Sequence, residues 1–338
     1  MMFTLDDLEH ATAIVHAAMP ATPQYPWPLL ARRFGCTVVV KHENHTPIGA
    51  FKVRGGLVYL DRLARERPHV RGILSATRGN HGQSLALAAS HFGVHAAIVV
   101  PRGNSVEKNA AMRAFGAELI EHGSDFDDAK QFATKLAEER GFEFVPSFHS
   151  DLVTGVATYA RELFEAFPDL DVVYSPIGLG SGICGLIGTR DLLALRTEIV
   201  GVVPRNANAY RLSLDAGRVV PVNQVTTFAD GAAVRVPDGT AFARIKAGAA
   251  RIVEVSEDEI AQAIRIYHED THNIAEGAGA LALAALAKER DELRGRKAGV
   301  VLSGGNIDRS WAAEVLAGRT PQLEQSPVRR NQPSVSAR

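Results

Sequence analysis

Residues 72–100 read GILSATRGNHGQSLALAASHFGVHAAIVV. Two apolar runs, at residues 72–75 and 96–100, flank a segment whose apolar side chains recur at helical spacing. A strand, a helix and a second strand in this order form a unit with parallel strands, because a helical crossover returns the chain to the same edge of the sheet. This stretch therefore predicts a parallel α/β fold.

The same alternation continues along most of the chain. Other short runs rich in β-branched residues are predicted strands, at residues 37–41, 118–121, 143–145, 172–175, 198–203, 251–255 and 299–302. Ligands bind at the carboxyl ends of strands in such sheets. The turns that follow these strands are therefore where we expect a functional site.

Length and charge restrict the function further. A chain of 338 residues is long enough for about two domains. Its 37 basic and 38 acidic side chains balance, so nothing predicts binding to nucleic acid or to an anionic membrane. With only two cysteines and no apolar run of about eighteen residues, we expect a cytoplasmic protein. The polar residues 320–338 predict a disordered tail.

A lysine is predicted in the first turn of the helix that follows the strand at 37–41. Residues 41–56 read KHENHTPIGAFKVRGG, and the helix is expected to begin near Phe51. The positive end of a helix dipole disfavours a cation, so we expect the pKa of Lys52 to fall, which suits a nucleophilic amine. For a lone lysine, simple solvation of a helix start is the commoner explanation.

Two further turns carry groups that suit anions. Residues 74–83, LSATRGNHGQ, combine the N–H groups of a helix start with Thr77, Asn80 and Gln83, which fits a substrate carboxylate. Residues 175–185, SPIGLGSGICG, allow the backbone to wrap a phosphate. Helix capping by Thr77 or Asn80 would also explain the first turn, and the second could serve a dinucleotide.

The last predicted strand ends in a polar side chain. In residues 300–308, VVLSGGNID, Ser303 follows buried positions and needs a hydrogen-bond partner. The nitrogen of a ligand ring is one possible partner. The next helix or the backbone is the other.

These four motifs, in this order, resemble the fold-type II pyridoxal-phosphate family, in its threonine dehydratase and serine racemase branch. The resemblance covers about residues 20–315 and rests on AFKVRGG, GNHGQ, the glycine loop and LSGGN. It implies an α/β fold of two three-layer α/β/α domains with mostly parallel sheets, similar to tryptophan synthase β, with pyridoxal 5′-phosphate in the cleft between them. It also implies a large domain of residues 1–65 and 150–319 and a small mobile domain of residues 66–149.

The resemblance assigns roles to individual residues. It makes Lys52 the catalytic residue that binds the cofactor covalently, brings Asn80 to the phenolic oxygen of the cofactor, and places Ser303 at the pyridine nitrogen. The other cofactor contacts that it implies are Phe51, Gly178, Leu179, Gly180, Ser181, Gly182, Gly231 and Glu276. The substrate is expected to bind Thr77, Arg78, Asn80, His81 and Gln83.

Two positions depart from the family pattern. Arg78 stands where the family usually has serine or alanine. Because that serine is an acid/base in racemizing members, racemization is disfavoured. Val203 replaces the usual acidic metal ligand, so no metal is expected. The guanidinium of Arg78 could clamp the substrate carboxylate, accept a second acidic group, or pair with a surface carboxylate.

Together these expectations describe a dehydratase that converts a β-hydroxy amino acid, first of all L-threonine or L-serine, to a 2-oxo acid and ammonia. The alternatives are a dehydratase for phenylserine or 3-hydroxyaspartate, a serine racemase, a β-replacement enzyme, a non-catalytic binding protein and a nucleotide-binding dehydrogenase. The expected partner is the amino-acid substrate, with neither nucleic acid nor a membrane. A homodimer is also expected.

Overall fold

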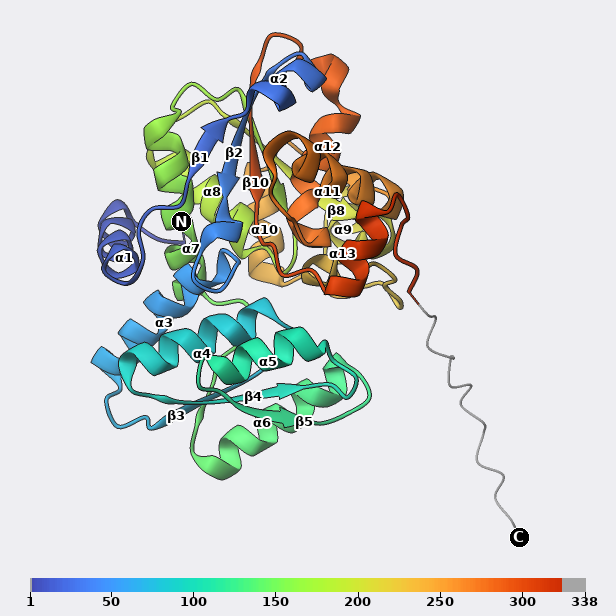
Figure 1. Cartoon of the computed structure of the whole chain (residues 1–338). Coiled ribbons are helices and arrows are strands. Elements are labelled where there is room, and N and C mark those ends of the chain that lie inside the picture. The colour runs from blue at the N-terminus through green and yellow to red at the C-terminus, as the bar shows by residue number, and fades with distance from the viewer. Residues whose placement is uncertain (1, 324–338) are drawn as a thin grey trace.

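The computed structural model describes residues 2–323. Two sheets, each flanked by helices, form an upper and a lower lobe in Figure 1. The six-stranded sheet has the order β1-β2-β10-β7-β8-β9, and the four-stranded sheet has the order β5-β4-β3-β6. All neighbouring strands are parallel except β1 and β2. The α/β fold with mostly parallel sheets is therefore confirmed.

The upper lobe contains the larger sheet. Its strands are β1 (Gln24–Pro26), β2 (Thr37–His42), β7 (Val172–Pro176), β8 (Glu198–Pro204), β9 (Arg251–Val255) and β10 (Lys297–Leu302). Its helices are α1 (Leu5–Ala18), α2 (Pro28–Phe34), α7 (Ser150–Ala166), α8 (Ser181–Leu192), α9 (Ala209–Ala216), α10 (Gly239–Gly248), α11 (Glu257–Thr271), α12 (Gly277–Lys288) and α13 (Arg309–Leu316).

The lower lobe contains the smaller sheet. Its strands are β3 (Gly72–Ala76), β4 (His95–Val100), β5 (Glu118–Glu121) and β6 (Glu143–Phe144), and its helices are α4 (Asn80–Phe92), α5 (Val106–Ala114) and α6 (Phe126–Arg140). Helix α3 (Lys52–Glu66) packs against both α4 and α7 and so joins the lobes.

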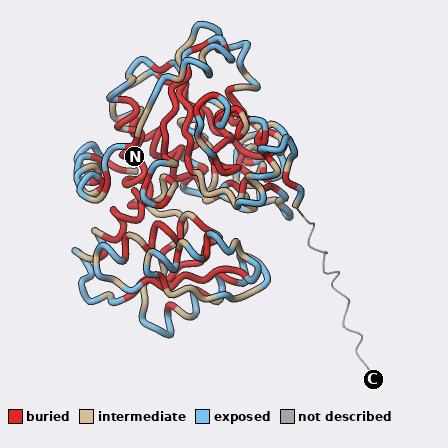
Figure 2. Tube along the Cα trace, viewed as in Figure 1, coloured by how far each residue is buried: buried red, intermediate tan, exposed pale blue. Residues whose placement is uncertain are grey.

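The larger sheet is buried on both faces. Val40 and Val200 lie in the core under α11 and α12, whereas their neighbours Val39 and Ile199 lie in the core under α7 and α8. Figure 2 shows the buried class concentrated along these strands. Burial on both faces explains why the strands appear in the sequence as continuous apolar runs.

The chain leaves the larger sheet through α3 and returns to it through α7, and these helices touch backbone to backbone. A Cβ atom on Gly55 would lie 2.7 Å from the Leu152 carbonyl oxygen, and one on Gly155 would collide with the Arg54 carbonyl oxygen. All four strands of the smaller sheet come from the residues between α3 and α7. We therefore keep the small mobile domain at residues 66–149 as a proposal.

Four charged side chains are buried together behind the start of α3. Arg54 donates to the carboxylates of Glu43 and Glu162, at 2.7 Å in each case, and Lys41 donates to Glu162. Each of these side chains is less than one-tenth exposed. Burial acts to raise the pKa of Glu162, but the hydrogen bonds and charges of Arg54 and Lys41 outweigh it and lower that pKa to about 2. The cluster ties α3 to β2 and α7.

Helix α5 of the smaller lobe contacts the larger lobe directly. Glu107 accepts a hydrogen bond from the backbone N–H of Arg309 at 3.1 Å, whereas Asp308, the N-cap residue of α13, makes no capping bond of its own. Ser105 donates instead to Asp308 at 2.5 Å. The first turn of α13 is thus capped from the opposite lobe.

The described chain ends beside the larger core. Thr320 donates to Asp258, and Leu323 packs against the core under α11 and α12. The rest of the predicted tail, residues 324–338, lies outside the described residues. Among residues 2–323, no helix combines the length and the apolar character needed to cross a membrane.

Candidate active site

Lys52 is the first residue of α3, and Phe51 is the N-cap, as the sequence predicts. Its Nζ donates to Ser181 Oγ at 3.3 Å and lies 5.1 Å from the centre of the Phe51 ring. Burial lowers the pKa of Lys52 to about 8. The lowered pKa agrees with the prediction, but its cause is burial and not the predicted helix dipole. Such an amine is substantially neutral, and therefore nucleophilic, near this pH.

The glycine loop joins β7 to α8. Gly180 has a φ of 105°, in the left-handed region, and no side chain caps the helix that follows. A Cβ atom on Gly178 would collide with the Gly231 carbonyl oxygen, so two loops meet here backbone to backbone. The first turn of α8 therefore offers uncapped N–H groups at a helix start, which suits a phosphate.

Two tyrosine hydroxyls donate hydrogen bonds to backbone carbonyls of this loop. Tyr210 donates to the Leu179 carbonyl oxygen at 2.9 Å, and Tyr159 donates to the Gly182 carbonyl oxygen at 3.1 Å. These two carbonyls are therefore paired within the protein, whereas the N–H groups at the start of α8 have no side-chain cap. Neither tyrosine was singled out from the sequence.

The turn before α4 has the same character. Gly79 is the N-cap residue, and no side chain caps this helix. Thr77 Oγ1 instead accepts from the Gly79 N–H at 3.1 Å, and Gln83 is buried within α4. Capping by Thr77 or Asn80, which the sequence left open, is therefore not the arrangement found, and the N–H groups of the first turn remain for a carboxylate.

Asn80 connects α4 to the larger lobe. Its Nδ2 donates to Glu276 Oε1 at 2.7 Å, and its Oδ1 accepts from Asn306 Nδ2 at 2.8 Å. Glu276 is the N-cap residue of α12, and its burial raises the pKa of its carboxyl group. The structure thus brings two predicted residues, Asn80 and Glu276, into direct contact.

Ser303 lies at the end of β10, and 3% of it is exposed. Its carbonyl oxygen accepts from the Phe51 N–H at 3.0 Å, so the end of β10 adjoins the lysine turn. The Ser303 hydroxyl makes no hydrogen bond with any residue from 2 to 323, and the N-cap residue of α13 is Asp308. This hydroxyl is therefore free to meet a ligand.

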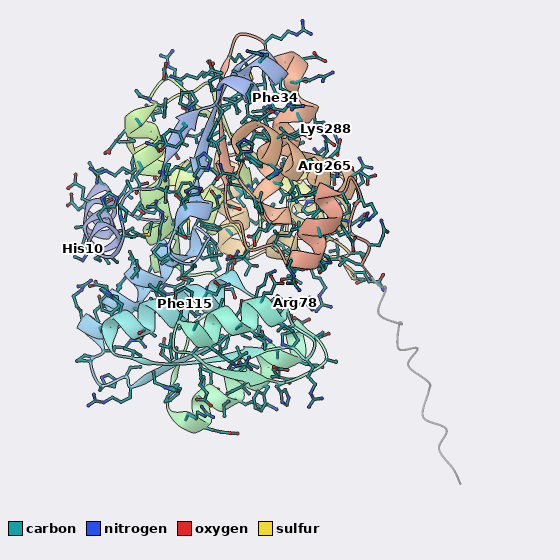
Figure 3. The ribbon with its side chains drawn as sticks, viewed as in Figure 1. His10, Phe34, Arg78, Phe115, Arg265 and Lys288 are labelled. Carbon is teal, nitrogen blue, oxygen red and sulfur yellow. The ribbon has the colours of Figure 1, made fainter. Side chains whose placement is uncertain are left out.

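Arg78 lies on the smaller lobe, on the side that faces the larger lobe (Figure 3). It is exposed and forms no ion pair with a carboxylate of the described part of the chain. Pairing with a surface carboxylate, one of its three predicted roles, is not observed there. The other two roles involve a bound ligand.

Sequence reasoning missed Lys108, which is 8% exposed and pairs with Asp230 at 3.1 Å. If Gly79 carried a Cβ atom, that atom would lie 2.9 Å from Lys108 Cδ. The aliphatic part of the Lys108 side chain therefore covers the start of α4. Burial acts to lower the pKa of Lys108, but the Asp230 and Glu276 carboxylates outweigh it and raise that pKa. No local pattern marks Lys108, whereas Asn306 lies inside the quoted LSGGN motif.

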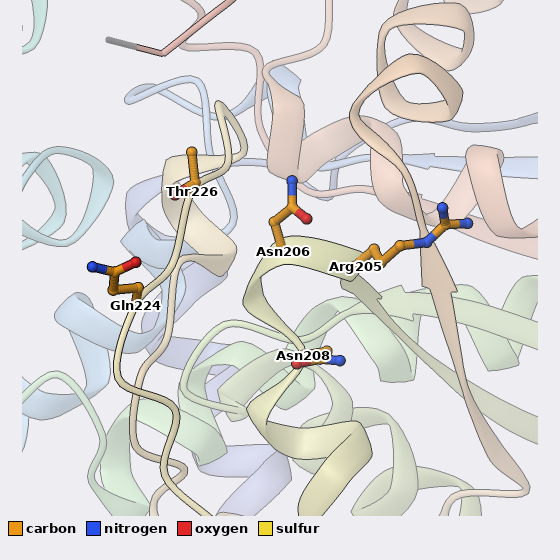
Figure 4. A pocket seen from close by; sticks show the side chains of 5 residues that line it. All are labelled: Arg205, Asn206, Asn208, Gln224 and Thr226. Atoms are coloured by element: carbon orange, nitrogen blue, oxygen red, sulfur yellow. The ribbon is translucent and has the colours of Figure 1, made fainter. Parts of the chain in front are cut away.

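A separate polar pocket of about 450 Å³ lies beyond the end of β8 (Figure 4). Its lining consists of Arg205, Asn206, Asn208, Gln224 and Thr226. None of these is a predicted site residue. Within residues 2–323, no three His, Cys, Asp or Glu side chains form a group that could hold a metal.

The residues around Lys52 fit pyridoxal 5′-phosphate. The uncapped start of α8 suits its phosphate, the amine of Lys52 suits its aldehyde, and the unpaired hydroxyl of Ser303 suits its ring nitrogen. The Phe51 ring lies beside the amine. The donor set therefore matches the chemistry of each part of the cofactor.

Comparisons with known proteins agree with this fit. The model of the family described as pyridoxal-phosphate dependent enzyme matches residues 16–304. The chain is 35% identical to L-threonine ammonia-lyase of Thermotoga maritima, over 93% of this chain and 78% of that protein. It is 31% identical to L-threo-3-hydroxyaspartate ammonia-lyase of Saccharomyces cerevisiae, over 94% and 97%.

Among solved structures, the processed form of threonine deaminase isoform 2 from Solanum lycopersicum is similar, with a TM-score of 0.85 and 30% identity. The alignment covers 94% of this chain and 95% of that one. The protein belongs to the family of pyridoxal-phosphate dependent enzymes, in its fold-type II arrangement, and pyridoxal 5′-phosphate is its cofactor.

Proposed function

We propose that the protein converts a β-hydroxy amino acid, L-threonine or L-serine, to a 2-oxo acid and ammonia by α,β-elimination of water. The observation that carries this proposal is the contact between the Lys52 amine and Ser181 of the glycine loop. This contact joins the proposed base, Lys52, to the start of α8, which is the proposed phosphate-binding site. Two relatives, one named for L-threonine and one for L-threo-3-hydroxyaspartate, are ammonia-lyases.

Lys52 is the catalytic residue in this proposal. Once displaced by the amino group of the substrate, its neutral amine removes the Cα proton as a general base. The cofactor, when bound, supplies the electron sink that stabilises the resulting carbanion. Ser303 presents a neutral hydroxyl and no carboxylate, so it does not hold a proton on the ring nitrogen, which favours loss of the β-hydroxyl.

The start of α4 binds the substrate carboxylate in this proposal. Its uncapped N–H groups, that of His81 among them, and the side chains of Thr77, Asn80 and Gln83 form the cradle. Asn80, held by Glu276 and Asn306, also orients the phenolic side of the cofactor. Phe51 and residues 178–182, with Gly231, complete the cofactor site.

A second candidate substrate is 3-hydroxyaspartate. It is favoured by Arg78, whose exposed guanidinium has no carboxylate partner in the described chain and could accept the second acidic group. Replacement Arg78→Ala separates the two substrates. Loss of the preference for hydroxyaspartate over threonine supports this candidate, and equal loss on both contradicts it.

The proposed function is tested by measuring 2-oxo acid formation from L-threonine, L-serine, phenylserine and both hydroxyaspartates, with Lys52→Ala as the control variant. Pyruvate from serine or 2-oxobutyrate from threonine supports the dehydratase. D-serine identifies a racemase instead, and a thiol adduct identifies a β-replacement enzyme. Absence of every product from all substrates contradicts the proposal.

Two further properties belong to the proposal. We place the protein in the cytoplasm, because Cys36 and Cys184 are both free and buried, as reducing compartments permit. We propose a homodimer on the family resemblance, which light scattering after gel filtration measures. The dehydrogenase considered from the glycine loop alone is excluded by the family to which the chain belongs.

A further inference from the structure

His81 carries a buried ring nitrogen that has no partner. The residue is 7% exposed, and its Nε2 is fully covered and makes no hydrogen bond within the described part of the chain. Buried polar groups in proteins are almost always paired, because an unpaired one costs free energy. An orphan nitrogen at a site that binds a cofactor and a substrate therefore points to a partner that is present only during the reaction.

The position of His81 identifies that partner. Three residues further along α4, Ser84 donates to the Lys52 carbonyl oxygen at 2.6 Å. Residues three apart lie on one face of a helix, so His81 shares the face that contacts the beginning of α3. The helices are tightly packed here, because a Cβ atom on Gly56 would collide with Ser84. The side chain of His81 therefore starts from the side of α4 that packs on α3, and the charge of Lys52 acts on its ring.

The charge state of His81 restricts what it can do. Burial, followed by the positive charge of Lys52, lowers the pKa of His81 to about 3. Lys52 is the charged group that acts on it. The ring therefore stays neutral at the pH of the cytoplasm and cannot serve as the acid or the base itself. What it can offer is a hydrogen bond.

We propose that Nε2 of His81 accepts a hydrogen bond from the Lys52 amine once the substrate has displaced that amine, and so aims its lone pair at the substrate Cα. His81 is a positioning residue in this role, which rests on the proposed function of Lys52. Ser181 Oγ accepts a second hydrogen from the same amine at 3.3 Å. With both N–H hydrogens of the Lys52 amine held in hydrogen bonds, its lone pair points in a single direction, toward the substrate Cα.

The proton moves from the substrate Cα to the Lys52 amine. The Cα–H bond breaks, the electron pair stays on carbon, and the proton forms the third N–H bond of a Lys52 ammonium group. His81 and Ser181 keep the other two hydrogens. The ammonium group then holds the transferred proton facing the site.

A competing role for Nε2 is donation to the substrate carboxylate, and the two roles require opposite tautomers. Nitrogen-15 NMR of the holoenzyme labelled at histidine distinguishes them. The probe is 2-methylserine, which displaces the lysine but has no Cα proton to lose. We expect an unprotonated Nε2 whose signal shifts when the probe binds, without titration between pH 6 and 9. A protonated Nε2 overturns the proposal.

Variants test the consequence for catalysis. We expect His81→Leu to slow exchange of the Cα proton of L-alanine in deuterated water by about 10- to 100-fold, because the amine is less well aimed. His81→Gln, which returns an acceptor near Nε2, should recover most of the rate. The visible cofactor band and the unfolding midpoint should be unchanged in both.

The controls separate this proposal from its alternatives. His91→Leu, at the exposed end of the same helix, should leave exchange at the wild-type rate. A rise in KM with an unchanged exchange rate in His81→Leu contradicts the proposal and favours carboxylate binding. Exchange needs no elimination, so a wild-type protein that exchanges alanine but releases no 2-oxo acid contradicts the dehydratase and leaves the role of His81 measurable.

Discussion

The lowered pKa of Lys52 has a direct consequence for pH dependence. Burial lowers this pKa to about 8, so the amine is protonated below that pH and neutral above it. Only the neutral form attacks the aldehyde of the cofactor. We expect the rate at which cofactor-free protein takes up pyridoxal 5′-phosphate to rise with pH and to level off above about 8. A rate that keeps rising up to pH 10 would contradict the lowered pKa of this amine.

Replacing Lys52 should remove the covalent attachment altogether. After reduction with borohydride, the wild-type chain should gain the mass of the reduced cofactor, whereas Lys52→Ala should not. Lys246 donates to the Gly217 carbonyl oxygen, outside the site, and Lys246→Ala is the matched control. Trapping that persists in Lys52→Ala would assign the cofactor to another lysine.

The buried cluster around Arg54 predicts a large loss of stability. Arg54→Met leaves the carboxylates of Glu43 and Glu162 buried without their main partner, which costs about 3–5 kcal/mol in such cases. Urea unfolding measures the loss, and adding Glu162→Gln to the same chain should recover part of it. Arg294→Met, at an exposed ion pair with Asp291, should cost about 0–1 kcal/mol.

At the scale of elements, the glycine loop depends on the approach of two backbones. Gly178→Ala would push its new methyl group into the Gly231 carbonyl oxygen and displace the loop from the start of α8. We expect the dissociation constant for the cofactor to rise by about tenfold or more, since N–H groups that bind phosphate act only at hydrogen-bond distance. Gly239→Ala has open space around it and should bind the cofactor normally.

Helix α13 receives its N-terminal cap from the other lobe. Glu107→Ala should therefore destabilise the first turn of α13 by about 1 kcal/mol, the usual effect of losing a cap. Faster hydrogen exchange at Arg309 and the residues after it, and a change in the fluorescence of Trp311 on the same helix, would report this loss. Unchanged exchange at Arg309 would show that the contact does not act as a cap.

The sequence predicted the regular elements well. Each strand inferred from an apolar run is present within two residues at each end, because strands buried on both faces must be apolar throughout. The strand β1 was missed. It has three residues, lies antiparallel at the edge of the sheet and includes Pro26, so it has little signal of its own.

For the whole molecule, the local motifs indicated residues that the structure brings into contact, Lys52 with Ser181 and Asn80 with Glu276, because ligand-binding residues in α/β folds lie in the turns after strands. What they could not predict were contacts between distant segments. The pairing of Lys108 with Asp230 depends on how the two lobes pack, and nothing near Lys108 in the sequence records it. The same holds for the tyrosines that occupy the carbonyls of the glycine loop.

Helices α3 and α7 cross where the chain leaves and re-enters the larger lobe. The smaller lobe is therefore one continuous insertion in the larger lobe. Gly55 and Gly155 bring the entry and the exit of the smaller lobe to one point. Three parts of the proposed cofactor site lie outside this insertion, namely Lys52, the glycine loop and Ser303. Exchange of the smaller lobe between relatives would therefore replace the proposed carboxylate cradle, and Asn80 with it, while Lys52, the glycine loop and Ser303 are kept.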